Sequence, residues 1–518
     1  MNRLKMMICG IAALLVAAII VVIVLLVIYE RRIEVMLPLL VVVWIINFSF
    51  VVYILGSDRH INTKACWCAV ISFLWTIGCL LFLIFGTNPL RRTKWKQRLE
   101  SQKTFNKFED YSYMKTFFDK NDDESNLLKY SFYVAFKPVY QNNDINILQS
   151  NTEIYEEYIK AIRSAKSFIH FETYLIRDGF FMRTVFCELI KKAKAGIKVR
   201  FLYDWYGSFM KFKKSQIDEL KAVGIEVGVF NFPGFNIFKG VTNFRLHHKA
   251  LIIDNSVAIY GGSNVGNEYL AMDPKKYYWR DMNMVIKGEI VNSLNIEFIN
   301  DWVLFTNNST TKASKDELSN NLDKWLHIDH SYNQDPVKAQ LSISSPNYSE
   351  KGVSNTMISL FLKAKKSIKL VSPYFLPTES TINALKIAAQ NGVEVKVLLP
   401  GKRDNKDFIL PMNRSQYRQL FETGIKVYEY NGFIHSKYII VDNKLVYATS
   451  ANFDFRSMII NFENGILIDA PEVCQQMLSI FEDDISNSQI VTAEDVAKHN
   501  NLRTKIRLAL LNLYKPLL

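Results

Sequence analysis

The sequence predicts an α/β fold in which two pseudo-repeated lobes, each a sheet flanked by helices, follow an N-terminal membrane block of three transmembrane helices. Three observations lead to this prediction. The first 90 residues contain three long uncharged runs, the rest of the chain alternates helix-like and strand-like segments, and that alternation is written twice. With 518 residues, 49% of them hydrophobic, the chain has room for more than one domain.

The predicted membrane block occupies residues 1–90. Its uncharged runs cover residues 6–29, 35–56 and 65–86, and each exceeds the ~18–20 apolar residues that cross a bilayer core. The first run resembles a signal peptide because Arg3 and Lys5 precede it, but it is too long for one, and two further runs follow at once. The connections are short, so we expect three antiparallel neighbouring helices.

Residues 91–139 are predicted to form a basic juxtamembrane connector. A single acid, Glu100, stands among the basic residues Arg91, Arg92, Lys94, Lys96, Arg98, Lys103 and Lys107. By the positive-inside rule this cluster places the lobes in the cytoplasm of a multi-pass cell-membrane protein, with the N-terminus outside despite its own two basic residues. The net charge of +13 indicates an anionic partner, either membrane lipid or nucleic acid.

From about residue 140 the chain can be laid over itself. The segments 161–169 and 361–369 each read as the end of a helix followed by a strand. Gly196 and Gly392 then precede β-branched runs, as do Gly224 and Gly424, which is the usual sign of a helix end and a strand start. We therefore predict a first lobe over residues 140–306, a polar linker over 307–336 and a second lobe over 337–518.

The two lobes differ by one insertion. The first lobe carries about 12 extra residues before its final hairpin, around 232–244, and they are more apolar than a free loop should be. This insertion either packs against its own lobe or contacts lipid, and the sequence does not choose between the two.

One polar pattern closes each repeat. His247, Lys249, Asp254 and Asn264 recur as His435, Lys437, Asp442 and Asn452, with offsets of two, five and ten residues in both copies. A short apolar run after each lysine and a turn at each aspartate predict a β-hairpin that returns the asparagine to the histidine end. An imidazole, an ammonium and an amide then converge, which makes a receptor for phosphate.

The cysteines indicate neither a disulfide framework nor a metal site. Four of the six lie in the N-terminal apolar runs, and Cys187 and Cys474 are isolated. No Cys, His and carboxylate cluster has metal-ligand spacing, so we expect no metal ion and no cofactor.

The doubled pattern is similar to that of the phospholipase D superfamily, and further segments resemble bacterial cardiolipin synthases in particular. The segments that carry this likeness are 138–143, 203–208, 262–269, 279–281, 372–377, 399–402, 452–463 and 515–518. The likeness covers nearly the whole chain. It departs from the family pattern at Thr449, where glycine is usual, and at Leu246, where asparagine is frequent.

The resemblance implies a role for each motif residue. His247 attacks phosphorus to give a phosphatidyl-histidine and His435 protonates the departing glycerol, although the repeat symmetry leaves the reverse order open. The phosphate-binding groups are Lys249, Lys437, Asn264 and Asn452. Asp281 and Glu463 resemble the acids that orient the histidines.

The motif also counts Asp254 and Asp442 among its catalytic residues, but we expect these carboxylates to brace the hairpins. His248 should point to the opposite strand face from His247 and be structural.

The activity that the resemblance implies is the conversion of two phosphatidylglycerol molecules to cardiolipin and glycerol by a membrane-bound phosphatidyltransferase. A hydrolytic phospholipase D uses the same groups with water as the acceptor and stays an alternative. A membrane-tethered nuclease of the superfamily suits the positive charge, but three predicted spans favour lipid, so we expect anionic membrane lipids and no nucleic acid as partners. A membrane scaffold without activity would not need two complete motifs.

Overall fold

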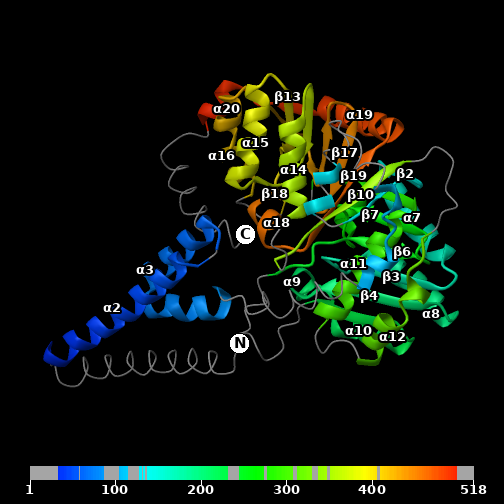
Figure 1. The fold of residues 1–518 in the computed structure, drawn as a ribbon, viewed down its shortest axis with the longest axis horizontal. Helices are drawn as coiled ribbons and strands as arrows, with labels where there is room; N and C mark the ends of the chain where they lie inside the picture. Colours follow the sequence, from blue (N-terminus) through cyan, green and yellow to red (C-terminus); the bar gives the residue numbers. More distant parts are fainter. Residues whose placement is uncertain are drawn as a thin grey trace. The chain divides into compact units, whose positions relative to one another are not determined.

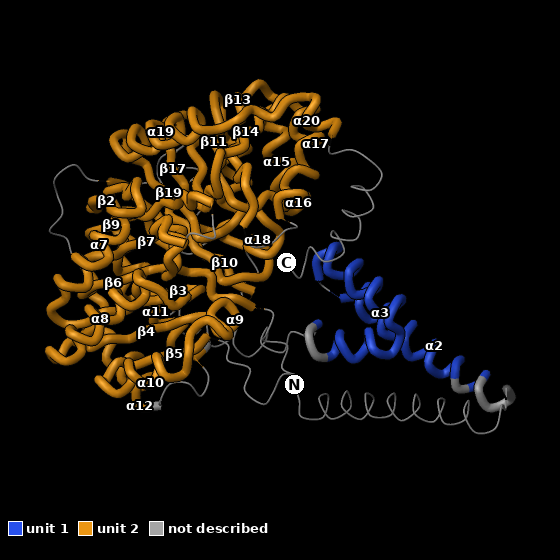
Figure 2. The backbone as a smooth tube through the Cα atoms, turned by 180° about the vertical axis from the view of Figure 1, so that it is seen from behind, with its two compact units in different colours: residues 1–89, 233–243, 509–518 blue, residues 90–232, 244–508 orange. Residues whose placement is uncertain are grey.

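A computed structural model describes residues 33–57, 59–86, 104–114, 128–130, 132–134, 137–230, 244–273, 277–306, 312–328, 337–346, 351–404 and 409–498. The chain divides into two compact units (Figure 2). The described part of the first unit lies within residues 33–86, and the second unit contains both predicted lobes.

The first unit consists of apolar helices. Helix α2 spans Ile33–Leu55, α3 spans Ile61–Leu81, and a short π-helix, η1, continues over Phe82–Gly86. The helices pack through Trp67 and Phe82, whose ring centroids lie 5.3 Å apart. Large apolar side chains such as Trp44 and Phe73 are 60% and 81% exposed, as side chains that face lipid would be.

Among the described residues, α3 is the one helix that is long and apolar enough to cross a membrane, and α2 holds a shorter apolar stretch at Leu40–Leu55. The predicted span at 6–29 lies outside the described residues. The three-span membrane block therefore stays a prediction.

The second unit is built on two large sheets (Figure 1). The first sheet has the order β2 (Asn143–Leu148), β9 (Asn283–Gly288), β7 (Val257–Gly261), β6 (Ala250–Ile253), β3 (Phe168–Thr173), β4 (Lys198–Asp204) and β5 (Glu226–Phe230). The second has the order β1 (Val139–Tyr140), β10 (Lys338–Ser344), β19 (Glu463–Asp469), β17 (Leu445–Thr449), β16 (Tyr438–Val441), β11 (Ser367–Val371), β13 (Glu394–Pro400), β14 (Lys426–Tyr430) and β20 (Ser488–Ile490). Two small parallel pairs join β8 (Trp279–Arg280) to β15 (Phe433–Ile434) and β12 (Phe375–Leu376) to β18 (Phe453–Asp454).

The two sheets share one topology. The order β2-β9-β7-β6-β3-β4-β5 corresponds strand for strand to β10-β19-β17-β16-β11-β13-β14. In each, the first four contacts are antiparallel and the last two are parallel. The internal repeat that the sequence predicts is thus a repeat of structure, extended in the second sheet by the edge strands β1 and β20.

Helices flank both sheets (Figure 1). The first lobe has α7 (Asn151–Ser164), α8 (Phe180–Lys194), α9 (Trp205–Ser208), α10 (Lys214–Ala222), the 3-10 helix η5 (Asn267–Leu270), α11 (Ile290–Phe305), α12 (Lys312–Asn320) and α13 (Leu322–Trp325). The second has α14 (Gly352–Lys363), α15 (Glu379–Gln390), α16 (Ile409–Ser415), α17 (Tyr417–Phe421), α18 (Phe455–Ile459), α19 (Pro471–Ser486) and α20 (Ala493–Lys498). The 3-10 helix η2 (Asn106–Phe108) precedes both lobes.

The hydrophobic cores explain how the lobes are joined. Helices α7 and α8 bury one face of the first sheet, and α14 and α15 bury one face of the second. The other faces of both sheets share a single core with α11 and α19. Helix α11 contacts β10 of the second lobe and α19 contacts β2 of the first, so the lobes are packed as one body.

Local sequence signals set the element boundaries. Ser150 and Glu153 form a capping box, in which the Ser150 hydroxyl accepts from the Glu153 N–H at 3.1 Å. The repeat glycines after α8 and α15, Gly196 and Gly392, have φ angles of 89° and 90°. A side chain would strain these left-handed positions, which is why glycine ends each helix there.

Two predicted boundaries differ from the structure. Tyr140 belongs to β1 and pairs with Ala339 in the sheet of the second lobe. Within the predicted linker, α12 and α13 bury Leu318, Leu322 and Trp325 against the first lobe. These three side chains recur at helical spacing in an otherwise polar segment, and this sparse stripe is enough to dock it. Of the apolar insertion, residues 232–243 lie outside the described residues.

Candidate active site

Both motif hairpins form as predicted. Strands β6 and β7 pair around Asp254 and Asn255, whose φ angles are 51° and 57°. Strands β16 and β17 pair around Asp442 and Asn443, with φ angles of 55° and 54°. Asp and Asn tolerate this left-handed conformation, so a two-residue turn matches the twist of the strands.

The segment before each histidine pairs with a segment of the other lobe. Leu246 forms a parallel bridge with Phe462, and the N–H of His247 donates to the Phe462 carbonyl at 2.9 Å. In the second motif β15 pairs with β8, and the N–H of His435 donates to the Arg280 carbonyl at 2.6 Å. The two bridges are equivalent when the repeats are exchanged, and each brings a histidine beside an acid of the opposite lobe.

Each motif histidine is held by one of these acids. His247 Nδ1 lies 2.9 Å from Glu463 Oε2, and His435 Nδ1 lies 2.7 Å from Asp281 Oδ2. Both carboxylates are fully buried, and the histidines are 7% and 6% exposed. When Nδ1–H donates to a carboxylate, the Nε2 lone pair of a neutral imidazole is left for a substrate.

Burial keeps both imidazoles neutral. Removal from water lowers the pKa of His247 to about 4, and removal from water together with the charge of Lys437 lowers that of His435 to about 3. The neighbouring acids oppose these shifts without reversing them. At neutral pH the resting site therefore holds two nucleophilic imidazoles.

The two acids stay ionised although they are buried. Burial acts to raise the pKa of Glu463, but the charge and hydrogen bond of His247 outweigh it, with Lys249 and Ser450, and lower that pKa to about 2. The Ser450 hydroxyl donates to Glu463 at 2.5 Å. Burial also acts to raise the pKa of Asp281, but His435, Lys437 and the Met282 N–H together lower it.

The motif lysines are the cations of the site. Lys249 Nζ donates to the His247 carbonyl at 2.6 Å, and Lys437 Nζ lies 3.3 Å from His435 Nε2. Burial lowers the pKa of Lys249 to about 7 and that of Lys437 to about 8. The charge of each lysine also acts on the histidine of the other motif, so the two motifs contribute to one site.

The motif asparagines lie at the same end of the hairpins. Asn264 accepts from the Leu175 N–H at 3.2 Å and donates to the Tyr269 hydroxyl at 2.5 Å. Asn452 is 6% exposed, and among the described residues its Oδ1 has no hydrogen-bond partner. A buried amide left in this state is suited to a ligand.

The threonine that departs from the family pattern has a structural role. Thr449 occupies the position of Gly261 in the first repeat. Its hydroxyl donates to the Asn464 carbonyl at 2.7 Å and accepts from the Ala451 N–H at 3.0 Å. These bonds fix the turn that leads to Asn452.

The structure does not bring Asp254 and Asp442 into the site. This corrects their inclusion among the catalytic residues of the motif. Asp254 accepts from the backbone N–H groups of residues 166–168 at 2.7–2.8 Å. Asp442 accepts from those of residues 365–367 at 2.7–3.1 Å. Both carboxylates tie the turn of the hairpin to the start of a neighbouring strand, at the end away from the histidines.

Aromatic rings complete the walls of the site, and sequence reasoning did not assign them. Tyr174 packs edge-on against His247 with ring centroids 5.0 Å apart. Tyr269 and Trp279 contact His435 at 5.4 and 5.2 Å. A signal existed for Tyr174, because it ends a strand that the repeat predicts.

Among the described residues, one group has donor atoms at metal-ligand spacing: Glu172, His248 and Asp301, all buried. His248 Nδ1 lies 3.0 Å from Asp301 Oδ2 and 3.8 Å from Glu172 Oε1. Burial opposes the charge of His248, but the hydrogen bond and charge of Asp301 raise its pKa to about 9. These contacts join the three side chains in one buried hydrogen-bonded ion cluster.

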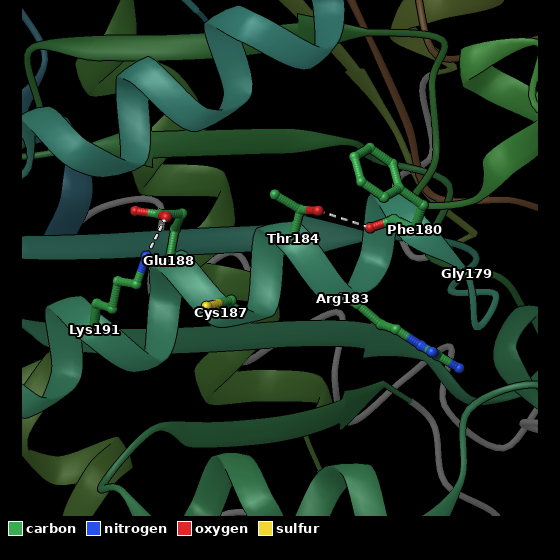
Figure 3. A pocket seen from close by; sticks show the side chains of 7 residues that line it. All are labelled: Gly179, Phe180, Arg183, Thr184, Cys187, Glu188 and Lys191. Atoms are coloured by element: carbon green, nitrogen blue, oxygen red, sulfur yellow. Dashed lines mark hydrogen bonds and ion pairs between the residues drawn. The ribbon is translucent and has the colours of Figure 1, made fainter.

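A separate hollow lies along the outer face of α8 (Figure 3). It is lined by Gly179, Phe180, Arg183, Thr184, Cys187, Glu188 and Lys191. Within it Glu188 pairs with Lys191 at 2.8 Å. It contains no motif residue and contributes nothing to the site.

The fold and the site define a class: two-lobed α/β proteins in which each lobe contributes one His, Lys and Asn set. The solved structure of a phosphatidylserine synthase from Haemophilus influenzae matches this fold with a TM-score of 0.58 at 18% identity, covering 77% of this chain and 100% of that one.

Sequence comparisons narrow the class. A family model described as cardiolipin synthase, PLD-like domain, matches residues 158–302 and 357–485, and the chain belongs to this family. A cardiolipin synthase of Clostridium perfringens (strain SM101) is 32% identical over 470 residues, which cover 89% of this chain and 95% of the relative. One from Halalkalibacterium halodurans is 31% identical over 459 residues, which cover 88% of each chain.

Proposed function

We propose that the protein is a membrane-bound phosphatidyltransferase that makes cardiolipin and glycerol from two phosphatidylglycerol molecules. The observation that carries this proposal is the single site formed by both motifs, in which two neutral imidazoles lie beside two buried lysines. Such a site offers one nucleophile, one proton carrier and two cations to a phosphodiester. The family to which the chain belongs supports the lipid substrate.

In the first step, His247 Nε2 attacks the phosphorus of the donor lipid. A P–N bond forms, the P–O bond to the headgroup glycerol breaks, and His435 gives that oxygen a proton. Lys249 and Lys437 stabilise the charge on the non-bridging oxygens throughout. The products of this step are free glycerol and a phosphatidyl-histidine.

In the second step, His435 takes a proton from the hydroxyl of a second phosphatidylglycerol. That oxygen attacks phosphorus, the P–N bond breaks, and His247 returns to its neutral form. His435 gives one proton in the first step and takes one back in the second, so the proton that it gains when substrate binds is released after the product leaves and none is consumed.

The proton on His435 depends on bound substrate. In the resting site burial and Lys437 keep this imidazole neutral, with its pKa lowered to about 3. A phosphodiester anion between the two lysines offsets their charge and favours the imidazolium, which Asp281 then stabilises across 2.7 Å. The alternative assignment makes His435 the nucleophile and His247 the proton carrier. It stays open because the crossed pairs, His247–Glu463 and His435–Asp281, are equivalent when the repeats are exchanged.

The proposed location is the cell membrane, with several spans and the lobes in the cytoplasm. The apolar helices α2 and α3 and the basic residues that follow them support it. A protease added to sealed cells should leave the segment 307–336 uncut, and the same protease should cut it after the cells are opened. Cleavage in intact cells would place the lobes outside.

The test of the activity uses purified full-length protein in detergent with phosphatidylglycerol as sole substrate. Glycerol and cardiolipin should appear in equal amounts. Phosphatidic acid as the main product would make the protein a hydrolytic phospholipase D. His247→Ala should abolish turnover, and His327→Ala, which removes an exposed histidine outside the site, should keep the wild-type rate.

A further inference from the structure

Two buried arginines lie beside the His247 half of the site, one from each lobe. Arg245 precedes His247 by two residues on the same extended segment, and Arg456 follows Asn452 in the first turn of α18. The two arginines accept hydrogen bonds from neighbouring residues of one segment. The Asn461 N–H donates to the Arg456 carbonyl at 3.0 Å, and the Phe462 N–H donates to the Arg245 carbonyl at 2.9 Å. The cross-lobe bridge that positions His247 therefore also positions this arginine pair.

The arginine side chains share one small region. The Arg245 guanidinium lies 3.7 Å above the ring of Tyr206. Both arginine charges act on the hydroxyl of Tyr174, whose ring packs against His247. Stacking uses the face of a guanidinium, and its N–H donors lie in its plane, where Arg245 Nη1 donates to the Phe244 carbonyl at 3.1 Å.

Like charges are brought close here. Burial, together with the charge of Arg245, lowers the pKa of Arg456 to about 10. The carboxylate of Asp204 interacts electrostatically with both guanidinium groups and also accepts from the N–H groups of Gly207 and Leu246, each at 2.9 Å. An arriving anion would relieve the repulsion between the guanidinium groups.

The pair is as accessible as the catalytic groups. Arg245 and Arg456 are each 8% exposed, compared with 7% for His247 and 6% for His435. The arginines are therefore no more deeply buried than the imidazoles.

The proposed reaction needs a second anion site. The acceptor lipid carries its own phosphodiester, joined through a three-carbon glycerol to the hydroxyl that attacks. When that hydroxyl meets the phosphorus on His247, the acceptor phosphate must lie next to the first phosphate site. The motif lysines and asparagines already surround the donor phosphate, and a hydrolase, whose acceptor is water, has no use for a second set of cations.

We propose that Arg245 and Arg456 bind the phosphodiester of the acceptor lipid and so select phosphatidylglycerol over water and over free glycerol. This inference rests on the proposed function. It deepens that function by naming the residues that recognise the second substrate.

The test compares two acceptors for one donor. In the first assay, purified full-length protein converts phosphatidylglycerol in detergent to cardiolipin. In the second, the same mixture contains radiolabelled glycerol, which resolves the same intermediate back to labelled phosphatidylglycerol. Glycerol exchange uses the donor site and both histidines but no acceptor phosphate.

Arg245→Gln and Arg456→Gln should each lower cardiolipin formation about tenfold or more, as expected for the loss of a charge-assisted hydrogen bond, and lower glycerol exchange by less than about threefold. The lysine variants Arg245→Lys and Arg456→Lys keep the charge and should lie between these values and wild type. Arg414→Gln removes an arginine paired with Glu429, away from the site, and should change neither rate.

Equal losses in both assays for folded glutamine variants, or no loss in either, would overturn the proposal. If a glutamine variant does not fold, the lysine variant decides: a selective loss of cardiolipin formation supports the acceptor site, and an equal loss in both assays rejects it. Glycerol exchange by the wild type without any cardiolipin would overturn the proposed function itself, and the acceptor site with it.

Discussion

Replacement of Glu463 by glutamine tests whether the crossed acid–histidine pairs act in the chemistry. The substitution keeps the shape of the side chain and removes its charge. The His247–Glu463 distance of 2.9 Å and the full burial of Glu463 make this a charge-assisted bond sheltered from water.

The size of the effect follows from the acid itself. The pKa of Glu463 is lowered to about 2 in spite of its burial, from an ordinary value of 4.5. At about 1.4 kcal/mol for each pKa unit, the site favours the carboxylate by about 3 kcal/mol. We expect a positive charge that develops on His247 in the transition state to gain an amount of this order, so the loss of the carboxylate charge should slow turnover about 100-fold.

The assay is the initial rate of cardiolipin formation by Glu463→Gln, with Glu429→Gln as the control. Glu429 is a half-buried acid that binds Arg414 and Tyr417 outside the site, so its variant should keep the wild-type rate. The melting temperatures of both variants should stay close to that of wild type. A folded Glu463→Gln protein within about threefold of the wild-type rate would refute the role assigned to the pair.

Three further predictions concern the rest of the site. After an alkaline quench, which preserves P–N bonds, His435→Ala should retain labelled lipid on the protein and His247→Ala should not; the reverse pattern would exchange the two roles. Burial lowers the pKa values of the two motif lysines to about 7 and about 8, so these cations are lost as the pH rises. We therefore expect kcat/KM to fall steadily above pH 8. A flat profile from pH 8 to 10 would show that phosphate binding does not need the lysine charges. Asp254→Asn should lower the free energy of unfolding by about 2 kcal/mol, because it weakens charge-assisted bonds to three backbone N–H groups, yet leave kcat unchanged; a large loss of kcat in a folded variant would return this aspartate to the chemistry.

Much of the fold could be predicted because the signals are local. Each motif hairpin depends on a turn of Asp and Asn, and the ends of α8, α10, α15 and α17 depend on glycines that accept a positive φ, so reading a few residues at a time is sufficient. The identical offsets of the two motifs then predict one site with two halves. The resemblance named the two acids, Asp281 and Glu463.

What the sequence could not show is which acid serves which histidine. When the two repeats are aligned, each lobe looks self-contained. The bridges of Leu246 to Phe462 and of β15 to β8 instead place the acid of each lobe beside the histidine of the other lobe. Such pairing depends on how two finished sheets dock. The polar segment 307–336 is predicted to be a linker for a similar reason, since its three spaced apolar residues can be interpreted only once the surface that they pack against is known.

The crossed pairs also have an evolutionary consequence. Because each repeat lends its acid to the histidine of the other, an isolated repeat has a histidine without a carboxylate and a carboxylate without a histidine. Two copies of a single repeat would supply both missing partners if they associated around a two-fold axis, since the contacts are equivalent under exchange. A symmetric dimer of a half-length chain would therefore complete this site, and in one continuous chain the two halves are free to differ, as Gly261 and Thr449 do.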